Sequence, residues 1–515
     1  MTTSSSNASA ASPASPADSP KPIRLSAQEL FDIVLDEGSF VSWDSPIIRP
    51  EGLSAEYLAD IAAAEKKSGV DESVLTGAGM IRGFRVALVA NEFRFLGGSI
   101  GIAAADRLEQ AIRRATSEGL PLLAAPASGG TRMQEGTAAF VQMVRITDAI
   151  AAHRAAGLPY LVYLRHPTTG GVFASWGSLG HVTVAEPRAL IGFLGPKVFQ
   201  ALYNEPFPPG VQLAENLLEH GLVDAVLPPQ KLADIASRAL TVLSAPRRGM
   251  PPIDAAPEEQ QPEETAWESI ARTRRPERPG VRELLRFAAT DVVPLNGTGQ
   301  GEAQPGLVLV LARFSGMPCV LLGQDRAWQG KNGPLGPEAL RVARRGMRLA
   351  DELDLPLVSV IDTPGAALSK EAEEGGLAGE IARCLADLVT LAAPTVCVLL
   401  GEGSGGGAMA LLPADRVIAA RHAWLSPLPP EGASAIVHGG DPSFAAEMAT
   451  AQGVRAVDMR RRGIVDRLVP EYDDAADEAA AFSRRMGAVI AQEIAVIATK
   501  PESQRLARRA GRYAF

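Results

Sequence analysis

Leu120-Pro121-Leu122-Leu123-Ala124-Ala125 is an apolar run that leads to Ser128-Gly129-Gly130, and Pro356-Leu357-Val358-Ser359-Val360-Ile361 leads in the same way to Thr363-Pro364-Gly365. Short apolar runs that end in Gly-rich or Pro-rich turns are typical of buried strands. Helical periodicity follows each turn. The two stretches therefore predict two copies of one unit, in which a strand, a turn and a helix follow one another.

The spacing of these units indicates a tandem duplication. Four pairs of anchors are 235 or 236 positions apart: Pro121 and Pro356, Pro159 and Pro394, Leu190 and Leu425, and Gly170-Gly171 and Gly406-Gly407. Only the glycine pairs have the spacing of 236. Because chance does not align four anchors in nearly one register, we predict an α/β protein that contains two tandem copies of one domain.

Composition divides the chain further. A length of 515 residues is too great for one hydrophobic core. Residues 1–22 are rich in Ser, Ala and Pro and have no apolar run, which predicts a disordered tail rather than a signal peptide. Residues 246–280 are rich in Pro, Glu and Arg and are typical of a linker. We therefore expect one domain over 23–245 and a second over 281–515.

Charge and residue usage exclude several classes of function. A net charge of −9 provides no basic surplus for a nucleic acid, and no stretch of 18 apolar residues could span a membrane. The three cysteines and six histidines show no metal-ligand spacing, so we expect reduced thiols and no metal site. This usage favours a cytoplasmic protein.

The strongest candidates for chemistry are two strand-to-helix junctions, Gly170-Gly171 and Gly406-Gly407 with Ala408. A helix N-terminus presents unpaired amides, and glycine lets a ligand oxygen approach them. Neither junction has the pattern of a nucleotide-binding loop, so we interpret both as oxyanion holes. The alternative is that the glycines only allow a helix and a strand to pack closely.

Arg132, which follows Gly129-Gly130, is the charged side chain that we expect to face a site, because arginine binds phosphate through two nitrogens. The alternative is an ordinary exposed ion pair with Glu135, three residues further along a helix.

A rival pattern occurs at 97–101, where Gly-Gly-Ser-Ile-Gly matches the nucleophile elbow of α/β hydrolases. Ser99 would be the nucleophile. The candidates for the acid and the histidine of such a triad are Asp224 with His422 or His438. Both histidines belong to the second copy.

Further motifs occur in a set order in each half. The first half contains 95–101 (FLGGSIG), 127–135 (ASGGTRMQE), 158–160 (LPY), 167–172 (PTTGGV), 185–187 (AEP) and 189–193 (ALIGF) with Gly195-Pro196. The second half contains Pro337-Glu338 with Arg341, 361–366 (IDTPGA), 380–383 (EIAR), 401–403 (GEG) with 406–408 (GGA), and 430–432 (PEG). Over about residues 30–480, this order resembles the carboxyltransferase of bacterial acetyl-CoA carboxylase, a member of the crotonase-like superfamily. The first half resembles its β subunit and the second half its α subunit.

The resemblance implies two tandem crotonase-like (ββα spiral) domains and transfer of a carboxylate from carboxybiotin to the α-carbon of acetyl-CoA or propionyl-CoA. It implies that Gly170 and Gly171 hold the thioester oxygen, while Gly406, Gly407 and Ala408 hold the ureido oxygen of biotin. It places Gly129, Gly130 and Arg132 near CoA. An enolate and a biotin anion would both be stabilised, and biotin itself would be the base.

The chain has no biotin attachment motif and no ATP-binding loop. The resemblance therefore implies a biotin carboxylase and a biotin carboxyl carrier protein on other chains, and a homo-oligomer, dimer or hexamer, that serves malonyl-CoA production and fatty acid biosynthesis. Two alternatives stay open: a biotin-dependent decarboxylase, and a non-catalytic scaffold subunit of a carboxylase complex.

The chain departs from the family in three places. The four-cysteine zinc ribbon at the start of the β subunit is absent, Ala367 stands where the family tends to have Tyr, and 324–328 (QDRAW) replaces a more basic segment. These departures affect the expected acyl-chain choice and the contacts with biotin, and they leave both glycine pairs intact.

Overall fold

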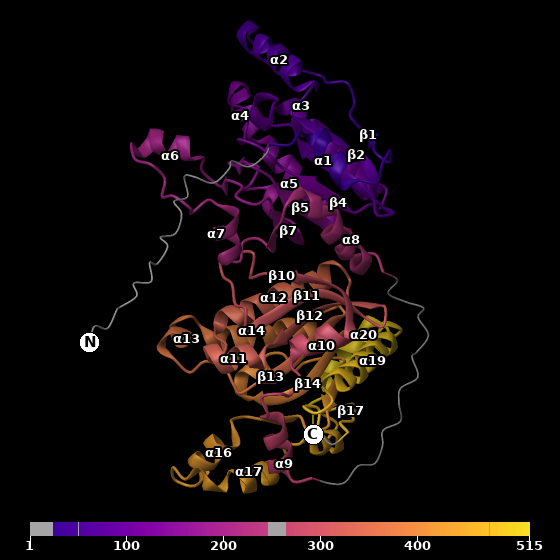
Figure 1. Ribbon diagram of the computed structural model, residues 1–515, viewed down its shortest axis with the longest axis vertical. Helices are drawn as coiled ribbons and strands as arrows, with labels where there is room; N and C mark the ends of the chain where they lie inside the picture. Colours follow the sequence, from indigo (N-terminus) through magenta and orange to yellow (C-terminus); the bar gives the residue numbers. More distant parts are fainter. Residues whose placement is uncertain (1–23, 50, 246–263, 473, 515) are drawn as a thin grey trace, which may run out of the picture.

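The computed structural model describes residues 24–49, 51–245, 264–472 and 474–514, which form two lobes stacked along the long axis of the molecule (Figure 1). The predicted tail at 1–22 lies outside the described residues. We call residues 24–245 the first lobe and residues 264–514 the second lobe. No helix in the described part of the chain is long and apolar enough to cross a membrane.

The first lobe is built on a seven-stranded sheet with the order β1-β2-β3-β4-β5-β7-β9. Strands β2 and β3 are antiparallel, and the neighbours from β3 to β9 are parallel. The strands of the first lobe are β1 (Val41–Ser42), β2 (Val74–Ile81), β3 (Phe84–Asn91), β4 (Leu122–Ala125), β5 (Tyr160–Leu164), β7 (Val182–Ala185) and β9 (Ala225–Val226), with β6 (Thr168–Thr169) and β8 (Ile191–Gly192) as a separate pair. Because helices cover the sheet, β4 and β5 are buried along their whole length, as their apolar sequences predict.

The second lobe repeats this arrangement in the order β10-β11-β12-β13-β14-β15-β17, with β16 paired to the end of β14. Strands β11 and β12 are antiparallel, and those that follow are parallel. The strands are β10 (Ala289–Leu295), β11 (Leu307–Phe314), β12 (Met317–Gln324), β13 (Leu357–Thr363), β14 (Thr395–Ser404), β15 (Arg416–Ala420), β16 (Trp424–Ser426) and β17 (Arg467–Val469).

Helices surround both sheets (Figure 1). Those of the first lobe are α1 (Ala27–Val34), α2 (Ala55–Ser68), α3 (Ile102–Ser117), α4 (Gly136–Phe140), α5 (Gln142–Ala155), α6 (Pro196–Tyr203), α7 (Ala214–Glu219) and α8 (Leu232–Leu243), with the short 3-10 turns η2 (Leu96–Gly98), η3 (Met133–Glu135), η4 (Trp176–Ser178) and η5 (Pro229–Lys231). Those of the second lobe are α9 (Ala266–Thr273), α10 (Val281–Ala288), α11 (Arg326–Asn332), α12 (Pro337–Glu352), α13 (Lys370–Glu374), α14 (Leu377–Thr390), α15 (Gly405–Met409), α16 (Pro430–Val437), α17 (Ala445–Gln452), α18 (Ala456–Arg461), α19 (Ala479–Ala498) and α20 (Glu502–Gly511), with η6 (Pro442–Phe444).

The predicted duplication is confirmed by the positions at which equivalent elements begin. Strands β4 and β13, strands β5 and β14, helices α3 and α12, and helices α5 and α14 all begin 235 residues apart. Since each sheet has an antiparallel hairpin followed by parallel strands, the two lobes share one topology. This is the tandem crotonase-like α/β fold that the sequence predicts.

Helix α8 joins the lobes through a continuous apolar interior. It packs against α1 and β2 of the first lobe and against β10, β11 and β12 of the second. Leu240 and Val242 are fully buried and belong to one hydrophobic cluster that extends through both lobes. Polar contacts add to this junction, because Arg154 pairs with Glu352 at 2.6 Å and Arg345 pairs with Asp224 at 2.9 Å.

Residues 246–263 of the predicted linker lie outside the described residues, and 264–280 pack on the second lobe. Ala266 and Ile270 of α9 are buried in a small cluster with Trp424. Arg278 is buried and forms two hydrogen bonds of 2.8 Å with Glu471. The polar composition predicted a linker at 264–280. The ion pair of Arg278 and the apolar face of α9 instead hold this stretch against the second lobe.

We expect Leu240→Ala to lower the free energy of unfolding by about 2–5 kcal/mol, because it removes a large buried side chain from the shared interior. Leu202→Ala on α6, whose side chain is 67% exposed, is the matched control and should change it little. Thermal and denaturant unfolding of both variants would measure this. Two separate transitions in the wild-type chain, with only one shifted by Leu240→Ala, would contradict a shared interior.

Candidate active site

Each lobe contains the same turn after the second parallel strand of its sheet. The Ser128 hydroxyl accepts a hydrogen bond from the amide of Gly130 at 3.0 Å, and the Thr363 hydroxyl accepts one from the amide of Gly365 at 3.2 Å. Gly130 and Gly365 have φ values of +110° and +140°, which disfavour any residue with a Cβ. The repeated turn therefore requires its glycine for backbone geometry.

In the first lobe this turn touches the loop that follows β6. A Cβ on Gly170 would lie 3.3 Å from the Cα of Gly130, and a Cβ on Gly130 would lie 3.5 Å from the Cα of Gly170. The two backbones therefore meet without side chains between them. A ligand in this place would face main-chain atoms from both loops.

In the first lobe, three of the four glycines proposed from sequence have amides that already bond to partners within the protein. The amide of Gly129 donates to the Gly97 carbonyl at 2.9 Å, that of Gly130 donates to Ser128, and that of Gly170 donates to the Phe193 carbonyl at 2.9 Å. Within the described part of the chain, the amide of Gly171 has no acceptor. Gly171 is thus the available donor, and Gly170, with φ of +67°, shapes the loop.

Thr131 is a further residue of this site, which the motif contained but sequence reasoning assigned no role. Its hydroxyl oxygen lies 3.3 Å from the position of a Cβ on Gly171. The Thr131 amide has no acceptor among the described residues either. Thr131 and Ile100 form an isolated parallel β-bridge, in which the amide of Arg132 donates a hydrogen bond to the Ile100 carbonyl at 2.9 Å. This bridge fixes the direction of the loop. We call Gly130, Thr131, Gly170 and Gly171 the first amide site.

The second lobe forms its counterpart at the junction of β14 and α15. A Cβ on Gly407 would lie 3.3 Å from the Ala366 nitrogen, and the amide of Ala366 has no acceptor among the described residues. Gly405, Gly406 and Gly407 form the first turn of α15, where amides have no acceptor within the helix. Ala408 is buried at the fourth position, where a helix amide is bonded internally. We call Gly365, Ala366, Gly406 and Gly407 the second amide site.

The structure corrects the register of the glycine pairs. Gly170 and Gly405 have nearly identical φ values of +67° and +64°, and they are 235 positions apart. Gly171 therefore corresponds to Gly406, and the spacing of 236 counted from sequence compared non-equivalent residues. The run of three glycines at 405–407 made the shift invisible in the sequence. The first junction also differs from the expected helix start, because η4 rather than an α-helix follows it.

Arg132 does not face a ligand, in contrast to the prediction. Its guanidinium is 1% exposed and binds the buried carboxylate of Glu72, with further bonds to the Ser99 carbonyl at 2.8 Å and to Tyr57 at 3.4 Å. Although burial opposes the charged form, Glu72 holds the pKa of Arg132 above its ordinary value. The pair with Glu135 does form, but inside the protein rather than on its surface. Arg132 therefore anchors the loop that carries Gly130 and Thr131.

The hydrolase alternative has no support in the geometry. The Ser99 hydroxyl donates to the Leu96 carbonyl at 2.8 Å and accepts a bond from Arg132. The turn η2 separates β3 from Ser99, so the serine does not stand on a tight strand-to-helix turn. Both histidines nominated for a triad lie in the other lobe, where His422 binds Glu471 at 2.8 Å.

Among the described residues, the three atoms nearest to a Cβ added at Gly171 or at Gly407 belong to no titratable side chain. The nearest atoms to a Cβ on Gly171 belong to Met143 and Thr131, and those to a Cβ on Gly407 belong to Ala366. Among the described residues, no cluster of histidine, cysteine and carboxylate side chains could hold a metal ion. The arrangement can hold an oxygen that carries negative charge through backbone amides alone.

Apolar side chains remain exposed beside each site. Phe140 and Val144 are exposed on α4 and α5 close in sequence to Met143, which lies beside Gly171, and Leu368 is exposed two residues after Ala366. Large exposed apolar groups that gather near a site are typical of surfaces that become covered.

A model of the carboxyl transferase domain family matches residues 24–513. The chain belongs to this family, as the motifs predict.

Curated relatives and solved structures agree with this assignment. A protein of Mycobacterium tuberculosis named as a probable biotin-dependent acyl-coenzyme A carboxylase beta3 subunit is 60% identical over 95% of this chain and 98% of its own length. The acetyl-coenzyme A carboxylase carboxyl transferase subunits beta/alpha of Salinispora tropica are 36% identical over 95% of this chain and 90% of theirs. The transcarboxylase 12S structure superposes with a TM-score of 0.73 at 22% identity over 92% of this chain and 90% of its own, which shows a shared fold.

We expect Glu72→Ala to lower the free energy of unfolding by about 3–5 kcal/mol, because it leaves the Arg132 guanidinium buried without its partner. Glu65→Ala is the control, since Glu65 forms a more exposed pair with Arg49 and should contribute less than about 1 kcal/mol. Denaturant titration compares the two. Equal losses for both variants would show that the buried pair has no special role.

Proposed function

We propose that the chain is the carboxyltransferase component of a biotin-dependent acyl-CoA carboxylase. It transfers a carboxylate from carboxybiotin, carried by a separate protein, to the α-carbon of a short acyl-CoA, which converts acetyl-CoA to malonyl-CoA or propionyl-CoA to methylmalonyl-CoA. The names of the relatives support this reaction class. The observation that carries the proposal is the presence in each lobe of one glycine-lined site whose backbone amides have no acceptor among the described residues.

The chemistry requires two sites of this kind. Removal of a proton from the α-carbon of a thioester gives an enolate whose charge rests on the thioester oxygen, and the carboxyl donor is bound through its ureido oxygen. Backbone amides that already point at such oxygens stabilise the charge without reorganisation. Carboxybiotin supplies the activated carboxyl group, and this chain positions the two reactants.

The residues divide between the two roles. In the first amide site, the amides of Gly171 and Thr131 hold the thioester oxygen, while Gly129, Gly130 and Gly170 give the loops their shape. In the second, Gly406 and Gly407 hold the ureido oxygen together with the Ala366 amide, and Ala408 forms the wall behind them. A Cβ at Gly407 would fill the space beside Ala366. Because glycine leaves this space open, the second site can accept the ureido group.

The assembly follows from the lobes. We propose that residues 23–245 form the acyl-CoA domain and residues 281–515 the biotin domain, and that the first domain of one chain faces the second domain of another in a homo-oligomer. The exposed apolar side chains near both sites support such contacts. A biotin carboxylase and a biotin carboxyl carrier protein on other chains complete the carboxylase.

The purified chain should decarboxylate malonyl-CoA or methylmalonyl-CoA when free biotin or biocytin is the acceptor, because the transfer step is reversible. Loss of the acyl-CoA carboxylate, followed by chromatography, measures the reaction, and the ratio of the two rates gives the acyl preference. Absence of turnover with both substrates, together with fluorophosphonate labelling of Ser99, would replace this function with the hydrolase alternative.

Gly171→Val and Gly407→Val should each lower kcat by about 100-fold to 1000-fold, as large as the loss of one oxyanion donor, because the valine side chain keeps the substrate oxygen away from the backbone amide. In both variants a bulky side chain enters space that only hydrogen occupies in glycine. Gly330→Val on α11, where a Cβ meets open space, is the control for folding. Full activity of both site variants would favour the scaffold alternative.

A further inference from the structure

A buried carboxamide lies between the two segments that form the second amide site, and the reaction described so far gives it no role. Gln324 is the last residue of β12, and its side chain is buried. The side-chain oxygen accepts a hydrogen bond from the amide of Asp362 at 3.2 Å, and the side-chain nitrogen donates one to the Gly407 carbonyl at 2.8 Å. Gln324 therefore joins the end of β13 to α15.

The two segments that Gln324 joins carry the donors of the second amide site. The turn after β13 leads to Ala366, whose amide has no acceptor among the described residues, and α15 begins with the glycines 405–407. A Cβ added at Gly407 would lie 3.3 Å from the Ala366 nitrogen. The distance between the donors therefore depends on how closely the turn and the helix approach each other.

The Gly407 carbonyl can accept the bond from Gln324 because α15 is short. In a continuous α-helix, this carbonyl would accept a bond from the amide four residues later, which is that of Leu411. The Leu411 amide instead donates to the Ala408 carbonyl at 3.2 Å. Gln324 supplies the donor that the helix lacks, and a buried carbonyl without any donor would cost free energy.

The first lobe contains the equivalent carboxamide. Asn91 is the last residue of β3, and β3 pairs with β4 in the register in which β12 pairs with β13. The Asn91 side chain accepts a bond from the amide of Ala127 at 3.4 Å, and Ala127 and Asp362 are 235 residues apart. Its nitrogen, however, donates to the Gly98 carbonyl at 2.9 Å, in the turn η2. The two carboxamides therefore share an acceptor role and differ in what they donate to.

The difference between the two side chains is one methylene group. The bond from the amide at the start of the turn occurs in both lobes, so it belongs to the duplicated fold. The longer side chain of Gln324 also reaches the glycine helix. Gln324 is the first residue of 324–328, the segment in which the chain departs from the motifs of its family. The bridge to α15 is thus a feature of the second lobe rather than of the repeat.

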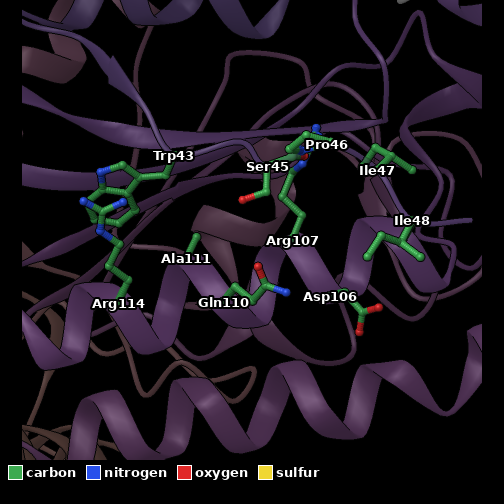
Figure 2. Close-up of a pocket in the computed structure, with 11 residues that line it drawn as sticks. Trp43, Ser45, Pro46, Ile47, Ile48, Asp106, Arg107, Gln110, Ala111 and Arg114 are labelled. Atoms are coloured by element: carbon green, nitrogen blue, oxygen red, sulfur yellow. The ribbon is translucent and has the colours of Figure 1, made fainter.

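A buried side chain elsewhere in the chain shows the contrast. Arg107 of α3 lines a cavity of about 350 Å³ beside residues 43–48 (Figure 2). Its guanidinium donates to the Ser45 carbonyl and to both carboxylate oxygens of Asp71, each at 2.9 Å. Neither α3 nor residues 43–48 belong to an amide site, so this anchor stabilises the lobe without placing a donor. Gln324 differs because both of its partners adjoin donors of one site.

We propose that Gln324 is a positioning residue for the second amide site, which holds the Ala366 amide and the amides of α15 at the spacing that one ureido oxygen requires. The proposal rests on the proposed function, because that function places biotin at this site. Donors stabilise a ligand oxygen best when they are oriented before it binds. Buried partners of this kind fix the orientation of the groups that contact the ligand. Gln324 acts through the two segments and needs no contact with the substrate.

Gln324→Asn tests the proposal in the full chain, because it keeps the carboxamide and shortens its reach by one methylene group. The variant should retain the acceptor for the Asp362 amide, as Asn91 does in the first lobe, and lose the bond to Gly407. With malonyl-CoA as carboxyl donor, KM for biocytin should rise about 10-fold, equivalent to about 1.4 kcal/mol, while KM for malonyl-CoA stays at the wild-type value. A fall in kcat with both KM values unchanged would overturn the proposal.

Gln492→Asn is the matched control, because it makes the same change at a buried glutamine of α19 that accepts a bond from Arg467 at 2.7 Å. Both KM values should stay at the wild-type level in this variant. An equal rise in KM for biocytin in the two variants would overturn the proposal, since it would show a general effect of shortening a buried glutamine.

Amide hydrogen exchange provides a readout that needs no substrate. The amides of Ala410 and Leu411, which bond to carbonyls of α15, should exchange about 10-fold faster in Gln324→Asn and at the wild-type rate in Gln492→Asn. Wild-type exchange in Gln324→Asn would overturn the proposal. A wild-type chain that does not decarboxylate malonyl-CoA with biocytin would contradict the proposed function instead, and the exchange rates would still decide whether Gln324 holds α15.

Discussion

The structure depends on one constraint: two backbone loops in each lobe must approach without side chains between them. A Cβ added to Gly170 would lie 3.3 Å from the Cα of Gly130 in the first lobe, and a Cβ added to Gly407 would lie 3.3 Å from the Ala366 nitrogen in the second. Amides that no internal acceptor satisfies can then face a ligand. Most buried amides in proteins are paired, so unpaired amides at two equivalent places indicate a function rather than a defect in packing.

The rest of the fold holds these loops in position. In the first lobe, the buried pair of Arg132 and Glu72 fixes the turn, and Tyr57 ties the same turn to α2. Helix α8 joins the lobes through one hydrophobic interior.

Sequence reasoning predicted the architecture well and the individual donors less well. Offsets of 235 residues identified the duplication, and the apolar runs at 120–125 and 356–361 correspond to β4 and β13. The Gly170 amide, however, is bound to Phe193, a residue 23 positions later whose contact has no local signal. Arg132 was expected to face a ligand because charged residues are mostly exposed. It is instead buried and bonded to the carboxylate of Glu72, which lies 60 residues earlier in the chain. Thr131 stood inside the motif, and only its position beside Gly171 gives it a role.

The sequence by itself determined the repeat, the α/β class, the family and the glycine positions, because these follow from local patterns of apolar residues, turns and motifs. Only the tertiary structure decided which amides remain free and which cations are neutralised. These properties depend on partners distant in the chain: the Phe193 carbonyl accepts the bond from the Gly170 amide, and Glu72 neutralises Arg132. A local pattern shows which groups can form hydrogen bonds or ion pairs. The folded chain decides which of these groups already have a partner.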